Sequence, residues 1–149
     1  MSNKDIIKKL KLISSLLELH GANQFKTKAY SSTVFTIERL GEQLDGKTED
    51  EMVALGISKG MASKIAQLLA EETTDELEKL QADTPKGVVQ MLDIKGIGAK
   101  KIKTVWDDLG IETIPDLLQA CQEGKIAQLK GFGDKTQQLI IEQIELIEK

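Results

Sequence analysis

Three glycine-containing segments recur along this chain, and they constrain its fold more than any other feature. They read GISKGMASKI, GIGAKKIKTV and GFGDKTQQLI, and they begin at Gly56, Gly96 and Gly131, at intervals of 40 and 35 residues. Each segment follows a short helix-compatible stretch and leads into an amphipathic helical pattern, which indicates a loose repeat of one helix–turn–helix unit. Glycine adopts positive φ without steric cost, so each unit can reverse the chain very tightly.

The composition favours helices between these turns. Leu, Ile, Lys, Glu, Gln and Ala dominate, aromatic residues make up 3% of the chain, and clusters of strand-favouring residues are missing. The 149 residues suffice for one domain with a core or for two very small ones. We predict an all-α fold.

Local patterns predict the first helix and the start of a later one. The first segment places Ile6, Leu10, Ile13 and Leu17 at helical spacing. Thr48 and Glu51 have the spacing of a capping box.

Another helix start is expected at Thr84-Pro85, with Thr84 as N-cap and the proline in the first turn. His20 falls on an apolar face, so we interpret it as a packed, hydrogen-bonded histidine.

Scarce cysteine and histidine exclude some classes of site. Cys121 is the single cysteine, so no internal disulfide can form, and a reducing, intracellular setting is expected. We interpret it as a small buried apolar residue. With one His and one Cys, a zinc site of the usual ligands is nearly excluded. No leader or membrane-spanning run is present, so we expect a cytoplasmic protein without membrane partners.

The charges are unevenly placed. A net charge of −4 argues against a simple polyanion binder, and acidic residues gather at 48–51 and 71–78. Lys95, Lys100, Lys101 and Lys103, however, fall close together. Attraction to phosphate decays over about 8–10 Å at physiological salt, so this local clustering matters more than the total.

A Gly-x-Gly turn before a helix is a phosphate site by geometry. The first backbone N–H groups of the helix point out of its start, and the missing Cβ atoms let a phosphate come close. On a helix that begins near Ala99, Lys100 and Lys103 lie opposite the apolar face and Lys101 flanks it, so all three should be free to meet a phosphate backbone. The alternative is an ordinary helical turn with a solvated lysine surface.

The three segments resemble helix-hairpin-helix motifs, which bind DNA without sequence preference. Their order, with the stretch NQFKTKAYSSTVFTIERLG, resembles the N-terminal region of family X DNA polymerases, especially the bacterial and archaeal branch. The resemblance covers essentially the whole chain. It implies a small four-helix lyase-like domain of the DNA polymerase beta type over residues 1–82, with the first hairpin. It also implies tandem helix-hairpin-helix units over residues 83–149.

The resemblance implies DNA as the partner, bound at gaps or nicks during repair such as base excision repair, with the protein at the bacterial nucleoid. We expect the Gly96 hairpin to be the main contact, because Asp134 at the third hairpin would repel phosphate. No cofactor is required, although carbonyls of the Gly96 hairpin could hold Na⁺ or K⁺. The candidate DNA contacts are Gly56, Ile57, Gly60, Gly96, Ile97, Gly98, Lys100, Lys101, Lys103, Gly131, Gly133 and Lys135, and the candidate cation carbonyls are those of Leu92, Ile94 and Ile97.

The resemblance also raises a 5′-deoxyribose phosphate lyase activity. Lys64 matches the lysine that forms a Schiff base with the sugar aldehyde, and Lys26 and Tyr30 match positions that contact the 5′-phosphate. The sequence departs from the family where Gly60 replaces a basic residue and where Glu76 replaces a phosphate-contacting lysine.

Nothing in the chain resembles a polymerase active site. We therefore expect no polymerisation from it, and we interpret it as a monomer or as a fragment of a larger polymerase. The rival interpretation is a helical protein-interaction module that does not bind DNA.

Overall fold

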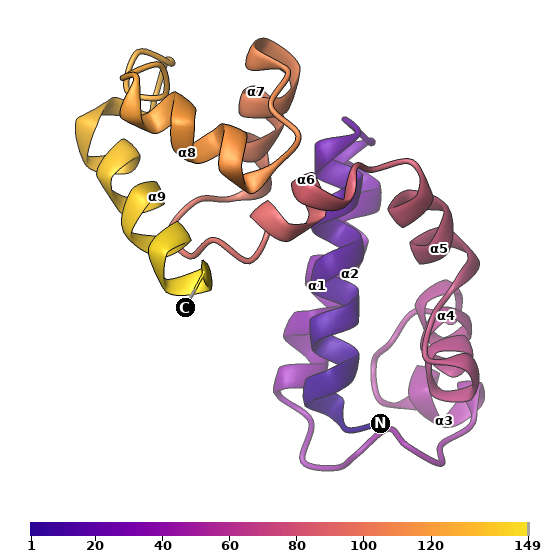
Figure 1. Cartoon of the computed structure of the whole chain (residues 1–149). Helices are drawn as coiled ribbons and strands as arrows, with labels where there is room; N and C mark the ends of the chain where they lie inside the picture. The colour runs from indigo at the N-terminus through magenta and orange to yellow at the C-terminus, as the bar shows by residue number, and fades with distance from the viewer. Residues whose placement is uncertain (149) are drawn as a thin grey trace. The chain divides into compact units, whose positions relative to one another are not determined.

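The computed structural model describes residues 1–148, and all regular structure in this range is helical, as predicted (Figure 1). The chain forms two compact units. Unit 1 comprises Met1–Leu17 and Gly21–Leu80, and unit 2 comprises Glu18–His20 and the residues from Gln81 onward. The helices are α1 (Asn3–Leu19), α2 (Gln24–Glu38), α3 (Glu49–Ala54), α4 (Lys59–Glu71), α5 (Asp75–Ala82), α6 (Lys86–Met91), α7 (Ala99–Leu109), α8 (Ile114–Gln122) and α9 (Gly133–Glu148). No helix among the described residues is long and apolar enough to cross a membrane.

Unit 1 is built around the apolar faces of α1 and α4. The α1 face predicted from helical spacing is buried, and Ile6, Leu10 and Ile13 are fully inaccessible. Helix α4 packs against α3 and α2. Asn3 fixes the loop after α2, because its Nδ2 donates to the Glu42 carbonyl at 2.9 Å and its Oδ1 accepts from the Leu44 N–H at 2.8 Å.

The predicted capping box before α3 is present. The Thr48 hydroxyl accepts from the Glu51 N–H at 3.2 Å, and a Glu51 carboxylate oxygen accepts from the Thr48 N–H at 3.0 Å. These reciprocal bonds satisfy two N–H groups at the helix start.

The prediction that Thr84 caps α6 is wrong. The N-cap is Pro85, and no side chain caps this helix. The Thr84 hydroxyl lies instead 2.7 Å from His20 Nε2. The His20 ring also meets Trp106 edge-on, with ring centroids 5.6 Å apart. The tertiary contact of Thr84 therefore replaces the local cap that its sequence context favours.

Unit 2 packs α6 against α7 and α8, and α8 against α9. Gly87 in α6 has no room for a side chain, since a Cβ there would lie 2.0 Å from the Glu112 carbonyl oxygen. Cys121 is buried, as expected, and burial raises the pKa of its thiol to about 11. This thiol therefore fits a packing role.

Candidate functional site

The three turns share a first glycine at positive φ, as the glycine pattern predicts. Gly56, Gly96 and Gly131 begin them with φ of 102°, 93° and 84°. The apolar residue that follows turns inward in each, and the exposed fractions of Ile57, Ile97 and Phe132 are 2%, 8% and 7%.

The turns differ at the start of the following helix. Gly98 is the N-cap of α7, with φ of −95°, and no side chain caps this helix. In the first turn, Ser58 is the N-cap of α4, and its hydroxyl accepts from the Met61 N–H at 3.3 Å. An anion at α4 would compete with this bond. At the start of α7, the Lys101 N–H donates to the Gly98 carbonyl at 3.1 Å, whereas the N–H groups of Ala99 and Lys100 have no acceptor among the described residues.

Gly96 is held in place by packing as well as by its backbone angle. A Cβ at this position would lie 2.3 Å from Leu139 Cδ2, so the second turn lies directly against α9. The α7 start is therefore part of a packed surface.

The lysines after this turn are not equivalent. Lys100 is exposed and forms no ion pair among the described residues. Lys101 Nζ donates to the Gly131 carbonyl at 2.7 Å and lies 4.9 Å from the centroid of the Phe132 ring. Lys103 Nζ lies 2.5 Å from Asp107 Oδ2. The expectation that all three are free is thus wrong for Lys101 and Lys103, because each already has a partner.

Carbonyls in the second turn are open. The carbonyl oxygens of Leu92, Ile94 and Ile97 accept no hydrogen bond from any described residue. Backbone carbonyl oxygens are ligands that can replace the hydration shell of a monovalent cation such as K⁺. In the third turn, the Lys101 ammonium already occupies the Gly131 carbonyl.

The remaining candidates surround the other two turns. Gly60 is the second residue of α4 and is exposed. Gly133 is the first residue of α9, with φ of 73°. Asp134 and Lys135 follow it in the first turn, both exposed. The acidic group at this helix start disfavours an anion there, while the α7 start has no acid in its first turn.

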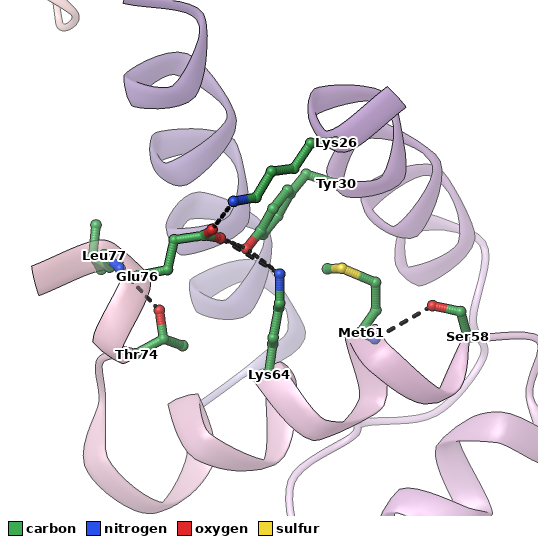
Figure 2. Close-up of polar contacts among 8 residues, drawn as sticks. All are labelled: Lys26, Tyr30, Ser58, Met61, Lys64, Thr74, Glu76 and Leu77. Atoms are coloured by element: carbon green, nitrogen blue, oxygen red, sulfur yellow. Dashed lines mark hydrogen bonds and ion pairs between the residues drawn. The ribbon is translucent and has the colours of Figure 1, made fainter. Parts of the chain in front are cut away.

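In unit 1, Lys26, Tyr30 and Lys64 converge on the Glu76 carboxylate (Figure 2). Lys26 Nζ lies 2.5 Å from Glu76 Oε2, and the Tyr30 hydroxyl donates to Glu76 Oε1. Lys64 Nζ lies 3.0 Å from the Tyr30 hydroxyl oxygen, 3.5 Å from Glu76 Oε1 and 4.8 Å from the centroid of the Tyr30 ring. Helices α2, α4 and α5 thus bring these four side chains together.

The charges of this cluster perturb its two acids. Burial raises the pKa of Glu76, but the hydrogen bonds from Lys26 and Tyr30 and the charge of Lys64 outweigh burial, so the pKa lies below its ordinary value. Burial, followed by the hydrogen bond and charge of Glu76, raises the pKa of Tyr30. Glu76 is therefore an anion at neutral pH, and Tyr30 is a neutral hydrogen-bond donor.

Glu76 occupies the position where an anionic ligand would be held by the two lysines and Tyr30. The family resemblance implied roles for Lys26, Tyr30 and Lys64 and marked Glu76 as a departure. It did not predict that this carboxylate bonds to all three. The one indication in the sequence was that Glu76 carries a negative charge at a position where the resemblance implied a lysine.

Comparisons with known proteins match both halves of the chain. A helix-hairpin-helix domain matches residues 1–74, and a SAM-like helix-hairpin-helix tandem matches residues 88–145. The chain is also similar to the DNA polymerase/3′-5′ exonuclease PolX of Bacillus subtilis, at 35% identity over 142 residues. This alignment covers 95% of the chain and 25% of the relative, so the chain spans about a quarter of that protein's length.

Proposed function

Since this chain consists of helix-hairpin-helix domains and resembles the N-terminal region of bacterial-type family X DNA polymerases, we propose that it binds the DNA backbone without sequence preference, at gaps or nicks during repair. The observation that carries the proposal is the start of α7, where Gly98 leaves the first turn without a side-chain cap and Lys100 is exposed. Backbone amides and a lysine beside them bind phosphate without reading bases.

A salt titration tests this function. We would measure anisotropy of a labelled duplex with a one-nucleotide gap, with and without a 5′-phosphate at the gap. Backbone binding predicts that log K falls steeply with log salt concentration. Weak binding with a flat salt dependence would support the rival protein-interaction module.

Gly98→Ala tests phosphate binding at the start of α7 most directly. A Cβ at Gly98 meets no atom within 4 Å, so the variant should fold, yet the added methyl group would lie where a phosphate must approach. Losing one charge-assisted hydrogen bond costs about 1.5–3 kcal/mol, or roughly tenfold or more in affinity. Gly41→Ala is the matched control, because its Cβ also meets nothing within 4 Å and Gly41 is not part of any of the three turns. Equal affinities of the two variants would contradict the site.

A monovalent cation is proposed at the Leu92, Ile94 and Ile97 carbonyls, which have no hydrogen-bond donor among the described residues. It would add positive charge beside the phosphate. Replacing K⁺ by tetramethylammonium at equal ionic strength should weaken DNA binding, because the larger ion cannot be coordinated by carbonyl oxygens. Unchanged affinity would argue against the cation.

A second candidate function is a 5′-deoxyribose phosphate lyase, favoured by the convergence of Lys26, Tyr30 and Lys64. The Lys64 amine would attack the sugar aldehyde and form a Schiff base with loss of water. Lys64 is ion-paired with Glu76, so that pair must open before the amine can react. Borohydride should trap an adduct on DNA with a 5′-deoxyribose phosphate, absent in Lys64→Ala and retained in Lys59→Ala. No adduct, or one that survives Lys64→Ala, would exclude this activity.

A further inference from the structure

A cavity of about 270 Å³ in unit 1 shares Tyr30 with the Glu76 cluster, and its other lining side chains form no hydrogen bond or ion pair with Glu76. Two buried side chains, Tyr30 and Val34, give it an apolar wall, and an ammonium and serine hydroxyls give it polar groups. Helices α1 and α2 both contribute to it. Its lining residues are Lys11, Ser14, Ser15, Tyr30, Ser31 and Val34.

The hydroxyls of the two serines in α1 have no hydrogen-bond partner among residues 1–148. Serine and threonine inside helices commonly bond to the carbonyl four residues earlier. Ser31 and Thr33 do so in α2, at 3.3 Å and 2.9 Å. Neither Ser14 nor Ser15 makes such a bond, or any other hydrogen bond with a described residue. Their O–H groups remain free to donate to a ligand in the cavity.

The charge around the cavity is positive. No acidic residue lines it, and Lys11 forms no ion pair within residues 1–148. Lys4, Lys8 and Lys11 are exposed and follow helical spacing, so they form one stripe along α1 that leads to the cavity. Lys8 also lines a second cavity in unit 1, which differs from the first because Asp5 and Glu72 line it as well.

We propose that this cavity binds a phosphate group of a nucleic-acid strand. One ammonium and two free hydroxyls supply several donors beside no anionic acceptor, which suits an oxygen-rich anion that accepts hydrogen bonds. The apolar wall of Tyr30 and Val34 would contact the attached sugar. The proposal rests on the proposed DNA binding and adds a second phosphate site in unit 1, made by residues that the helix-hairpin-helix turns do not include.

Two sets of variants distinguish the contribution of the serine hydroxyls to phosphate binding from that of the Lys11 charge. The double variant Ser14→Ala/Ser15→Ala removes both donors, keeps the charge and substitutes a good helix former, so it should fold. Its control is Ser32→Ala, an exposed α2 serine that does not line the cavity. Lys11→Gln tests the ammonium, and Lys79→Gln on α5 changes the net charge equally outside the cavity.

Binding of single-stranded oligonucleotides to the full chain would be measured with and without a 5′-phosphate. We expect the double serine variant to weaken binding at least fivefold, and Ser32→Ala to leave it unchanged. Lys11→Gln should lower the salt slope by about 0.7, the value for one single-strand phosphate. A loss confined to the phosphorylated strand identifies a terminal phosphate as the ligand, and an equal loss on both strands identifies an internal phosphodiester.

A titration with inorganic phosphate tests whether the cavity binds phosphate when no DNA is present. The backbone amide NMR signals of residues 14 and 15 should shift in the wild-type chain and not in the double variant, where both residues are alanine. Wild-type affinity of the double serine variant together with unshifted signals would overturn the cavity site. If Gly98→Ala still weakened DNA binding in that case, the proposed DNA binding would stand without the cavity site. Shifted signals in a chain that does not bind DNA would instead retain phosphate binding and refute the DNA function.

Discussion

The three lysines after the second turn should contribute unequally to DNA binding, and single substitutions would reveal the order. Lys100→Ala removes the exposed, unpaired ammonium at the start of α7. Lys103→Ala removes an ammonium that Asp107 already neutralises at 2.5 Å. Each phosphate contact contributes about 0.9 to the slope of log K against log salt for duplex DNA. We therefore expect Lys100→Ala to lower the slope by about 0.9, and Lys103→Ala to lower it much less.

The same arithmetic gives the change in affinity. Over a fourfold range of salt, from 50 to 200 mM, one contact corresponds to a factor of about 3.5 in K. The wild-type and Lys100→Ala titration curves should therefore converge by about this factor as salt rises. Asp107→Asn supplies the opposite change, because it releases Lys103 and should steepen the slope.

The assay is a set of anisotropy titrations on one gapped duplex at four or more salt concentrations, with the fold of each variant checked by circular dichroism. Equal slopes for Lys100→Ala and Lys103→Ala would refute the reasoning, since they would mean that the ion pair with Asp107 does not limit Lys103. A wild-type slope after Asp107→Asn would refute it independently.

Four further predictions rest on the packing, the pKa or the exposure of single side chains. Gly87→Ala should lower the free energy of unfolding by more than about 3 kcal/mol in urea titrations, because its Cβ would overlap the backbone before α8, whereas Gly41→Ala should change it by less than about 0.5 kcal/mol. The pKa of Glu76 is lower in the folded protein than its ordinary value of 4.5, so the ionised carboxylate stabilises the fold above about pH 4.5, and this stabilisation is lost as pH falls through the folded pKa. The stability of Glu76→Gln, measured by circular dichroism, should therefore depend less on pH below about pH 4.5 than that of the wild type. The Cys121 thiol should react with Ellman's reagent at pH 8 at least tenfold faster in urea than in the native state, since it is buried with a pKa of about 11. Phe25→Ala should weaken binding to single-stranded DNA by about 1–3 kcal/mol, because this side chain is 82% exposed and available to stack on a base.

The fold was predictable because its determinants are local. Glycine at positive φ, a buried residue after it and an amphipathic helix beyond are all properties of short segments. The error at Thr84 shows the limit of this reasoning. A threonine before a proline is a good helix start, but its hydroxyl bonds to His20, 64 residues away along the chain. No local pattern reports a contact at that distance in sequence.

The partners of Lys103 and Lys101 differ in whether the sequence could have predicted them. Lys103 and Asp107 stand four residues apart on one helix, so their ion pair was readable from the spacing. The bond from Lys101 to the Gly131 carbonyl was not, because it spans 30 residues and depends on how the second turn packs against α9. The convergence of Lys26, Tyr30 and Lys64 was expected only from the family resemblance.

The placement of acids explains how a chain of net charge −4 can still offer a phosphate site. Glu76 neutralises lysines inside unit 1, and Asp107 neutralises one lysine on α7. Asp107 lies eight residues after Ala99, about 12 Å along the helix axis, and the Debye length at physiological salt is about 8 Å. The Asp107 charge is therefore largely screened at the α7 start, where the N–H groups and Lys100 act on a ligand. The local field at this turn, more than the total charge, decides whether a phosphate binds there.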